Sequence, residues 1–409
     1  MSGSLRCDVV VIGGGPAGSS TASLLAGRGR SVILLEKERF PRFHIGESLL
    51  PRSLSVLREL GVVPALEQGY LRKYGARFCD SATGRIAHYR FVEALDPGEQ
   101  FAYQVPRAAF DEMLLDAAGR RGVQVLQGWT ASDVCFEGGR AAGVVARSDD
   151  GSSRRIDASF VVDASGRDTL LASGKRLRGL LPGLDKTAIY SHWDGVWREA
   201  GDDQGNIQIV LFEPGWFWFI PFAGTMTSVG CVLSSEYVRT KRPDEALGAF
   251  FERTIAMSSF ASEWLRAATL ATEVGAVADF SYRVRELAGP GWVLVGDAAG
   301  FIDPLFSTGV HLALENARLA AETIDAVLDA GDLDPARFDP YVRAARRGAE
   351  TFVGLVQAFY DGAFREALFA EHQRPLLRRM ITSLLSGDVF DEGASWSRFV
   401  VERYPARLG

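Results

Sequence analysis

The chain has 409 residues, a length that allows two or three domains around a large core. Hydrophobic residues make up 47% of the chain and charged residues 23%, which is ordinary for a globular enzyme, and the net charge of −6 argues against a nucleic-acid partner. The four cysteines and five histidines are scattered without metal-ligand spacing, so we expect no metal site and a reduced, cytoplasmic protein. We also expect no signal peptide and no membrane span, since we find no apolar run of about 18 residues.

The N-terminal segment predicts a strand, a helix and a second strand, over 9–13, 16–27 and 31–36. Between the first strand and the helix lie glycines at the spacing G-x-G-x-x-G. Gly13 would permit a tight turn, Gly15 the approach of a pyrophosphate, and Gly18 close packing of helix on strand. Glu36, at the end of the second strand, would accept hydrogen bonds from ribose hydroxyls. Glycines alone would only mark a turn, but in this βαβ frame they predict a bound dinucleotide.

The rest of the chain predicts an α/β (α+β) fold in which a separate sheet interrupts the nucleotide-binding part. Helices are expected over 48–60, 107–119, 243–268 and 309–328, and mostly helical structure over 336–409. Strands are expected over 123–126, 134–136, 143–147, 155–156, 160–163, 187–198, 206–213, 216–221, 226–233 and 292–295, and strand-like segments within 74–103.

These elements suggest three structural regions. We expect a discontinuous Rossmann-like domain from 1–72, 104–175 and 276–330, an inserted and mostly antiparallel sheet domain from 73–103 and 176–275, and a helical C-terminal region over 331–409.

A second cofactor signature follows the strand over 292–295. Asp297, at the strand end, would accept a hydrogen bond from a ribityl hydroxyl, and Gly309 would present main-chain amides to an anion or a flavin carbonyl. Taken alone, the segment equally fits an ordinary strand–turn–helix with a capping aspartate. Beside the βαβ unit it favours a flavin.

An aromatic strand is predicted at 216–221. Trp216, Trp218 and Ile220 would fall on one face, and Phe217 and Phe219 on the other. Such a strand is either a core strand buried on both faces or a stiff apolar wall that keeps water away from a reactive flavin.

Three motifs resemble the fingerprints of the FAD-dependent monooxygenase superfamily: G-x-G-x-x-G, the D-x-x-G from Asp163 to Gly166, and the G-D-A that contains Asp297. Arg107 matches a residue near the flavin, and Ala131 a position whose main chain meets the adenine. The resemblance implies FAD, held by Gly13, Gly15, Ala17, Gly18, Glu36, Arg42, Ser48, Arg107, Ala131, Asp297 and Gly309. There is no second G-x-G-x-x-G with a strand and an acid, so reducing equivalents would come from a transiently docked nicotinamide or another protein.

Two segments further resemble the flavin-dependent halogenases, phenol or pyrrole type. These are W-x-W-x-I-P, from Trp216 to Pro221, and P-R-x-x-x-G-E-S, from Pro41 to Ser48. The resemblance implies that Lys73 is catalytic and that backbone amides of Thr308 and Gly309 hold a halide. It implies that the flavin is shielded by Trp216, Trp218, Ile220, Pro221 and Phe306. Without the resemblance, Lys73 would be an ordinary solvated lysine.

The implied reaction uses reduced FAD from a separate flavin reductase, O2, and chloride or bromide. Hypohalous acid forms beside the flavin, crosses the aromatic partition, and is held by Lys73 through a hydrogen bond or as a chloramine next to an electron-rich ring. Alternatives are an FAD monooxygenase, dehydrogenase or prenyl reductase of the same fold, or a flavoprotein-like binding protein without turnover.

The resemblance also narrows the substrate. Phe306 stands where indole-type members carry a glutamate, which favours a phenolic or pyrrolic ring, in some members tethered to an acyl or peptidyl carrier protein. Because this chain is acidic, an acidic carrier would need a local basic patch, for which Arg374, Arg378 and Arg379 are candidates. The C-terminal region is shorter than in many phenol-type members, which would suit an open site, a carrier-bound substrate or a relative without halogenation.

Overall fold

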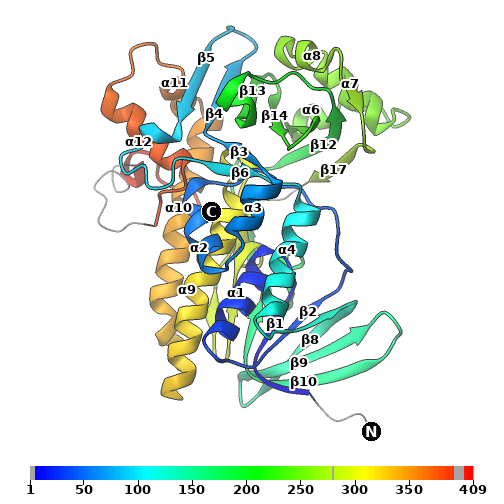
Figure 1. Ribbon diagram of the computed structural model, residues 1–409, viewed down its shortest axis with the longest axis vertical. Coiled ribbons are helices and arrows are strands. Elements are labelled where there is room, and N and C mark those ends of the chain that lie inside the picture. The colour runs from blue at the N-terminus through cyan, green and yellow to red at the C-terminus, as the bar shows by residue number, and fades with distance from the viewer. Residues whose placement is uncertain (1–4, 279–280, 391–399, 409) are drawn as a thin grey trace.

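The computed structural model describes residues 5–278, 281–390 and 400–408. Two eight-stranded sheets lie one above the other along the long axis, and the helices α9 (Thr308–Ala330) and α10 (Asp339–Tyr360) run along one side (Figure 1). Tyr341 of α10 belongs to the core of the lower sheet, and Phe359 to a core of the upper sheet. Helix α10 therefore connects the two parts of the molecule.

The lower sheet contains the predicted βαβ unit (Figure 1). Its central strand β1 (Leu5–Ile12) runs parallel to β2 (Val32–Glu36) on one side and to β10 (Ser153–Asp163) on the other. Val9, Val10 and Val11 are fully buried, as a continuous apolar run predicts for a parallel sheet covered on both faces. The remaining strands are β7 (Gln124–Gln127), β20 (Trp292–Leu294), β19 (Ala288–Gly289), and the ribbon β8 (Trp129–Glu137) and β9 (Arg140–Ser148).

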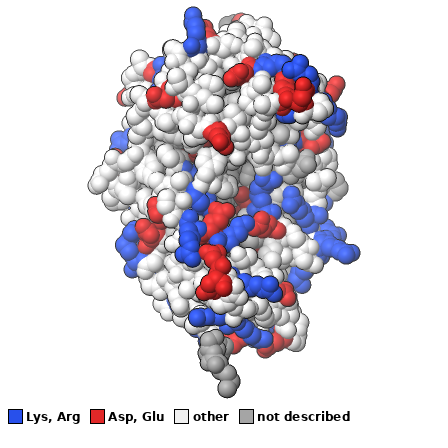
Figure 2. All heavy atoms as spheres, turned by 90° about the vertical axis from the view of Figure 1, so that its right-hand side faces the viewer, with Lys and Arg blue, Asp and Glu red and all other residues white. Residues whose placement is uncertain are grey.

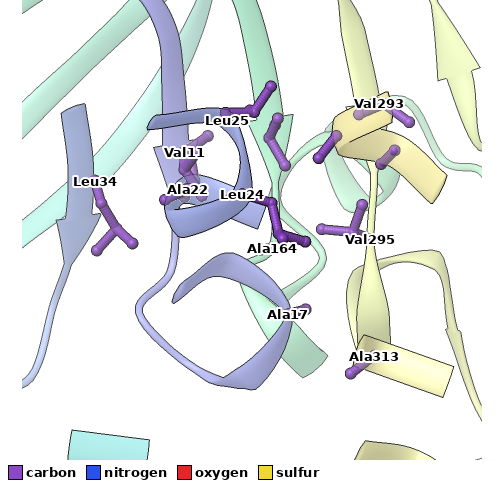
Figure 3. Packing of buried hydrophobic residues seen from close by; sticks show 14 of the residues in the cluster. Val11, Ala17, Ala22, Leu24, Leu25, Leu34, Ala164, Val293, Val295 and Ala313 are labelled. Atoms are coloured by element: carbon purple, nitrogen blue, oxygen red, sulfur yellow. The ribbon is translucent and has the colours of Figure 1, made fainter. Parts of the chain in front are cut away.

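Helix α1 (Pro16–Gly27) packs on this sheet through small and aliphatic side chains. Figure 3 shows that cluster, labelled at Val11, Ala17, Ala22, Leu24, Leu25, Leu34, Ala164, Val293, Val295 and Ala313. Close approach depends on Gly18, since a Cβ there would lie 1.9 Å from the carbonyl oxygen of Gly13. This is the packing that the G-x-G-x-x-G spacing predicts.

The upper sheet separates two cores. Trp216, Trp218 and Ile220 lie in the core shared with the C-terminal helices, whereas Phe217 and Phe219 lie in the core under the helices α7 (Leu247–Ile255) and α8 (Ser259–Leu265). The predicted alternation along the aromatic strand is confirmed. In spatial order the strands are β16 (Thr269–Leu270), β12 (Lys186–Asp194), β15 (Met226–Ser234), β14 (Gly215–Pro221), β13 (Ile207–Phe212), β4 (Gly75–Asp80) and β5 (Ile86–Arg90), with β17 (Gly275–Ala278) also on β12.

Short elements complete the chain. The two-stranded ribbon consists of β3 (Leu71–Lys73) and β6 (Ala102–Gln104), and a three-stranded sheet of β11 (Arg178–Leu180), β18 (Tyr282–Val284) and β21 (Gly300–Phe301). The remaining helices are α2 (Leu54–Glu59), α3 (Val63–Gly69), α4 (Arg107–Arg120), α5 (Leu170–Gly174), α6 (Ser235–Val238), α11 (Ala363–Leu368) and α12 (Pro375–Leu385).

Several predicted boundaries are wrong. The helix expected over 48–60 begins late, because Ser48 bridges to Gln104 and the Leu49 amide donates to the Tyr103 carbonyl oxygen. The strands expected over 155–156 and 160–163 form the single strand β10, which pairs with β9 from Ser153 to Asp157 and with β1 from Ile156 to Asp163. The helix expected over 243–268 divides into α7 and α8, and Ser258 caps the second.

Charged side chains of both signs lie next to one another in the middle and lower part of the face in Figure 2. That face therefore presents no uniformly basic surface of the kind that binds nucleic acid. Among the described residues, no helix combines the length and apolar character that crossing a membrane requires. Nor do His, Cys, Asp and Glu side chains of the described residues form a group that would hold a metal ion.

Candidate active site

A cavity of about 470 Å³ lies between the turn that joins β1 to α1 and the aromatic strand β14. Gly13 and Glu36 line one end, and Trp216 and Trp218 the other. The predicted cofactor residues that line the cavity are Gly13, Gly15, Ala17, Glu36, Arg42, Ser48, Arg107, Ala131, Asp297 and Gly309. Gly18 instead serves the packing of α1, as described above.

The first two glycines of the motif have different surroundings. Gly13 has a φ of +101°, and a Cβ there would lie 2.3 Å from the Ala164 carbonyl oxygen. Gly15 is extended, with φ −70° and ψ −175°, and the nearest atom to a Cβ there is Nη2 of Arg42, 3.4 Å away. The missing side chain of Gly15 thus leaves space inside the cavity at the start of α1, where amide donors favour an anion.

Glu36 is held rigidly at the end of β2. Its Oε2 accepts from the Gly14 amide at 2.7 Å and its Oε1 from the Glu38 amide at 2.8 Å, and the side chain is buried. A carboxylate has about four acceptor positions, so capacity remains for ribose hydroxyls. The geometry fits the ribose contact that the motif predicts.

Two arginines share one buried carboxylate beside the cavity. Arg107 donates to both oxygens of Asp111, at 2.7 and 2.8 Å, and to the Ile45 carbonyl oxygen at 2.7 Å. Arg42 donates to Asp111 at 3.2 Å, and its side chain lies beside Gly15. Arg42 also pairs with Glu38, at 3.4 Å between Nε and Oε2. Both guanidinium groups line the cavity, where N–H donors of this kind would bind a pyrophosphate.

Asp297 provides a carboxylate to the cavity. Among the described residues no side chain or amide donates to that carboxylate, although the Asp297 carbonyl oxygen accepts from the Tyr282 hydroxyl at 2.7 Å. Burial raises the pKa of Asp297 to about 6, opposed by the positive charges of Arg107 and Arg167. An acceptor without a protein partner fits a ribityl hydroxyl, so the residues of this cavity fit FAD.

The segment that precedes α9 brings backbone amides to the same cavity. Ser307, Thr308 and Gly309 line it, and Ser307 adopts a left-handed conformation with φ +58°. Thr308 is buried at the first position of α9, where amides lack helical partners and favour an anion.

The aromatic strand forms the opposite wall. Trp216, Trp218 and Ile220 line the cavity, whereas Pro221 and Phe306 do not. Phe306 is buried against the edges of the Phe359 and Phe364 rings, 6.4 and 5.8 Å between centroids.

Lys73 is buried, with 1% of its surface exposed, and does not line the cavity. Its Nζ donates to Ser48 Oγ at 3.0 Å and to the Leu49 carbonyl oxygen at 3.1 Å, and lies 5.4 Å from the centroid of the Phe91 ring. No carboxylate is paired with it among the described residues, and burial lowers the pKa of its amine to about 7. Ser48 is both a cavity residue and a partner of Lys73, so it links the amine to the cavity wall.

The sequence did not single out Ser48 as the partner of Lys73, nor Asp303 and Tyr360 behind the cavity wall. Of the candidate basic patch, Arg378 donates to Glu93 at 2.8 Å and Arg379 to the Leu95 carbonyl oxygen at 3.2 Å. These two arginines therefore hold the segment after β5 against α12.

Known flavin-dependent halogenases are similar to this chain in sequence. The tryptophan halogenase family model matches residues 8–96 and 81–376. The chain is 35% identical over 367 residues to a tryptophan 2-halogenase of Chondromyces crocatus, covering 88% of this chain and 69% of that protein. It is 34% identical over 407 residues to a 1H-pyrrole-2-carbonyl-(peptidyl-carrier protein) chlorinase of Pseudomonas fluorescens, covering 94% of this chain and 89% of that protein.

A crystal structure of a flavoprotein/dehydrogenase from Cytophaga hutchinsonii matches with a TM-score of 0.88 and 32% identity, over 96% of this chain and 95% of that chain. The α/β class with a Rossmann-like FAD-binding fold is thereby confirmed. The chain belongs to the tryptophan halogenase family and is a flavin-dependent halogenase, an oxidoreductase that uses FAD, a halide and O2.

Proposed function

We propose that this halogenase chlorinates or brominates a pyrrolic or phenolic ring, presented on a carrier protein, with Lys73 as the residue that delivers the halogen. The observation that carries the proposal is the environment of Lys73: a buried amine that is bonded to a hydroxyl on the cavity wall and is paired with no carboxylate in the part of the chain that the structure describes. A surface lysine has no such environment.

The amine is suited to accept a halogen. When neutral, it has two N–H groups, which match Ser48 Oγ and the Leu49 carbonyl oxygen, and one lone pair. That lone pair would take the electrophilic halogen of hypohalous acid, forming an N–halogen bond while the oxygen leaves as water with a proton from the amine. The halogen then passes to the ring carbon, which loses its proton, and the amine is regenerated.

The cavity supplies the other functions. Bound FAD, in its reduced form, would supply the electrons with which O2 is activated to oxidise the halide. The backbone amides of Thr308 and Gly309 would hold that halide. Trp216, Trp218 and Ile220 would exclude water and the organic substrate from the flavin side.

The carrier-bound pyrrole is supported by two relatives. Besides the chlorinase of Pseudomonas fluorescens, a 1H-pyrrole-2-carbonyl-(peptidyl-carrier protein) brominase of Pseudoalteromonas luteoviolacea is 32% identical, covering 94% of this chain and 92% of that protein. The apolar Phe306 is compatible with a ring that needs no carboxylate for activation. We further propose a cytoplasmic location, a separate flavin reductase as partner, and the three-region division given under Sequence analysis.

The test is mass spectrometry of products formed with a flavin reductase, NADH, O2 and either chloride or bromide. Pyrrolyl and phenolic substrates are supplied free and loaded on a carrier protein. We expect the halogen mass increment on a loaded substrate and none when the reductase is omitted. Halogenation of free substrates alone would overturn the carrier proposal. Flavin turnover without any halogen incorporation would instead match a dehydrogenase, as the Cytophaga hutchinsonii protein is described.

The amine of Lys73 also predicts a pH dependence. Since its pKa is about 7, the neutral fraction should rise about tenfold between pH 6 and pH 8. We expect the single-turnover bromination rate to rise with pH by this factor. Bromide is used in this assay because hypobromous acid is a weaker acid than hypochlorous acid and stays mostly protonated over this pH range. The rate of flavin oxidation, followed by absorbance in the same samples, serves as the control. A bromination rate that falls with pH, or stays flat, would exclude the neutral amine as the acceptor.

A further inference from the structure

Behind the cavity wall, one hydroxyl connects three separate parts of the chain. The Trp216 indole Nε1 donates to the Tyr360 hydroxyl at 2.9 Å, and this hydroxyl donates to Asp303 Oδ2 at 2.7 Å. Trp216 lies on β14, Tyr360 is the last residue of α10, and Asp303 precedes α9. The bonds form a directed chain from the aromatic wall, through the C-terminal region, to the segment that carries Thr308.

Asp303 in turn fixes the backbone that leads to Thr308. Its Oδ1 accepts from the Leu305 amide at 3.1 Å and caps the single turn Pro304–Phe306. Ser307 follows in the left-handed region, a conformation that costs a non-glycine residue free energy and persists only where its surroundings impose it. The positions of the Thr308 and Gly309 amides therefore depend on how firmly Asp303 is held.

The carboxyl group of Asp303 has few other hydrogen-bond or charged partners among the described residues. It is fully buried, and burial raises its pKa to about 6. The positive charge that opposes this rise in pKa is on Lys186, whose Nζ lies 4.4 Å from the centroid of the Tyr360 ring. The Tyr360 hydroxyl is thus one of two groups that donate to this carboxyl among the described residues, the other being the Leu305 amide.

We propose that Tyr360 is a positioning residue for halide binding. Its hydroxyl fixes the side chain of Asp303 relative to Trp216, and thereby sets the positions of the backbone amides of Thr308 and Gly309. This inference rests on the proposed placement of the halide at those amides. It gives α10, one helix of the C-terminal region, a part in the active site, although Tyr360 does not line the cavity.

The decisive variant is Tyr360→Phe, which keeps the ring and removes the hydroxyl. A buried carboxyl and an indole N–H then lose a partner, and the backbone at Ser307 is free to relax. We expect the apparent KM for bromide to rise about tenfold, the equivalent of one lost hydrogen bond to a charged group. The Kd for FAD and kcat at saturating bromide should change by less than about threefold on the same scale.

The matched control is Ser228→Ala. Ser228 Oγ accepts from the Trp218 Nε1 at 3.1 Å, so this variant removes the hydroxyl partner of the neighbouring tryptophan on the same strand but has no bond to Asp303. We expect the bromide KM to stay unchanged in Ser228→Ala. Both variants should shift the hydrogen-bond-sensitive indole band in ultraviolet resonance Raman spectra, which shows that each bond existed.

A direct binding measurement separates this inference from the proposed function. Bromide is titrated into the oxidised FAD complex and followed by flavin absorbance, without turnover. Weaker bromide binding in Tyr360→Phe than in the wild type and in Ser228→Ala supports the inference. Equal binding in all three, or an equal loss in both variants, overturns it. If the wild type itself shows no bromide-dependent change, the halide placement fails, and the inference fails with it.

Discussion

Replacement of Lys73 by methionine is expected to abolish halogenation while FAD binding and peroxide release continue. If the amine carries the halogen, its removal leaves Ser48 Oγ without the amine that donates to it among the described residues. We expect product formation to fall by about 10⁴-fold or more, the order of loss seen when a single catalytic nucleophile or base is removed. Peroxide release should stay at the wild-type level, because the flavin reacts before the step that uses Lys73, and the hypohalous acid then escapes without transfer to the ring.

Methionine is chosen because Lys73 is buried beside Phe91, where alanine would leave a cavity. The measurement combines mass spectrometry of product, a peroxide assay and flavin fluorescence titration on the same preparation. Lys241→Met is the matched control: its Nζ donates only to the neighbouring Arg242 carbonyl oxygen at the surface, among the bonds of the described residues. Halogenation that persists in Lys73→Met would remove this residue from the mechanism.

The same variant should also change how the free energy of unfolding depends on pH, which tests the burial of the amine independently of its part in catalysis. Because burial lowers the Lys73 pKa from 10.5 to about 7, the unfolded chain holds its proton more tightly than the folded chain. Between about pH 7 and pH 10.5 the unfolded state therefore binds more protons, and the wild-type stability gains a contribution that rises with pH. Because methionine does not titrate, the free energy of unfolding of Lys73→Met should lack this increase with pH. Urea unfolding at two pH values within this window measures it.

The nucleotide-binding part could be predicted from sequence because its determinants are local. Gly13, Gly15 and Gly18 act at fixed spacing within one turn, and Glu36 follows at the end of the next strand. The alternation of Trp216 to Ile220 could likewise be predicted, because a strand has a period of two. In these segments the local conformation and the tertiary fold favour the same structure.

The contacts that organise the rest of the site are long-range, and local patterns do not contain them. Ser48 meets Lys73 because its backbone pairs with Gln104, and the same pairing delays the start of the helix expected over 48–60. Asp303 meets Tyr360 only because α10 spans both parts of the molecule. An amphipathic helix indicates which face is buried but not which side chain it meets. The three-stranded sheet β11–β18–β21 was missed because its strands are too short to show a period.

Replacement of Gly15 by valine is expected to eliminate FAD binding in a protein that still folds. The Gly15 backbone, at φ −70° and ψ −175°, is accessible to any residue, and a Cβ there contacts only Nη2 of Arg42, at 3.4 Å. The fold therefore accommodates the side chain, whereas the valine methyl groups would occupy the space proposed for the pyrophosphate. We expect FAD affinity to fall at least about 100-fold, or about 2.7 kcal/mol.

Two glycines within α1 make this prediction specific. A Cβ at Gly18 would lie 1.9 Å from the Gly13 carbonyl oxygen, so Gly18→Ala should lower the melting temperature before any ligand is added. A Cβ at Gly27 would meet only Arg121 Nη1 at 3.5 Å, so Gly27→Ala should keep both stability and flavin. Flavin absorbance of the purified variants and thermal unfolding of their apo forms distinguish the three. Full flavin content in Gly15→Val would show that the pyrophosphate does not pass over this glycine, and would move the cofactor away from the start of α1.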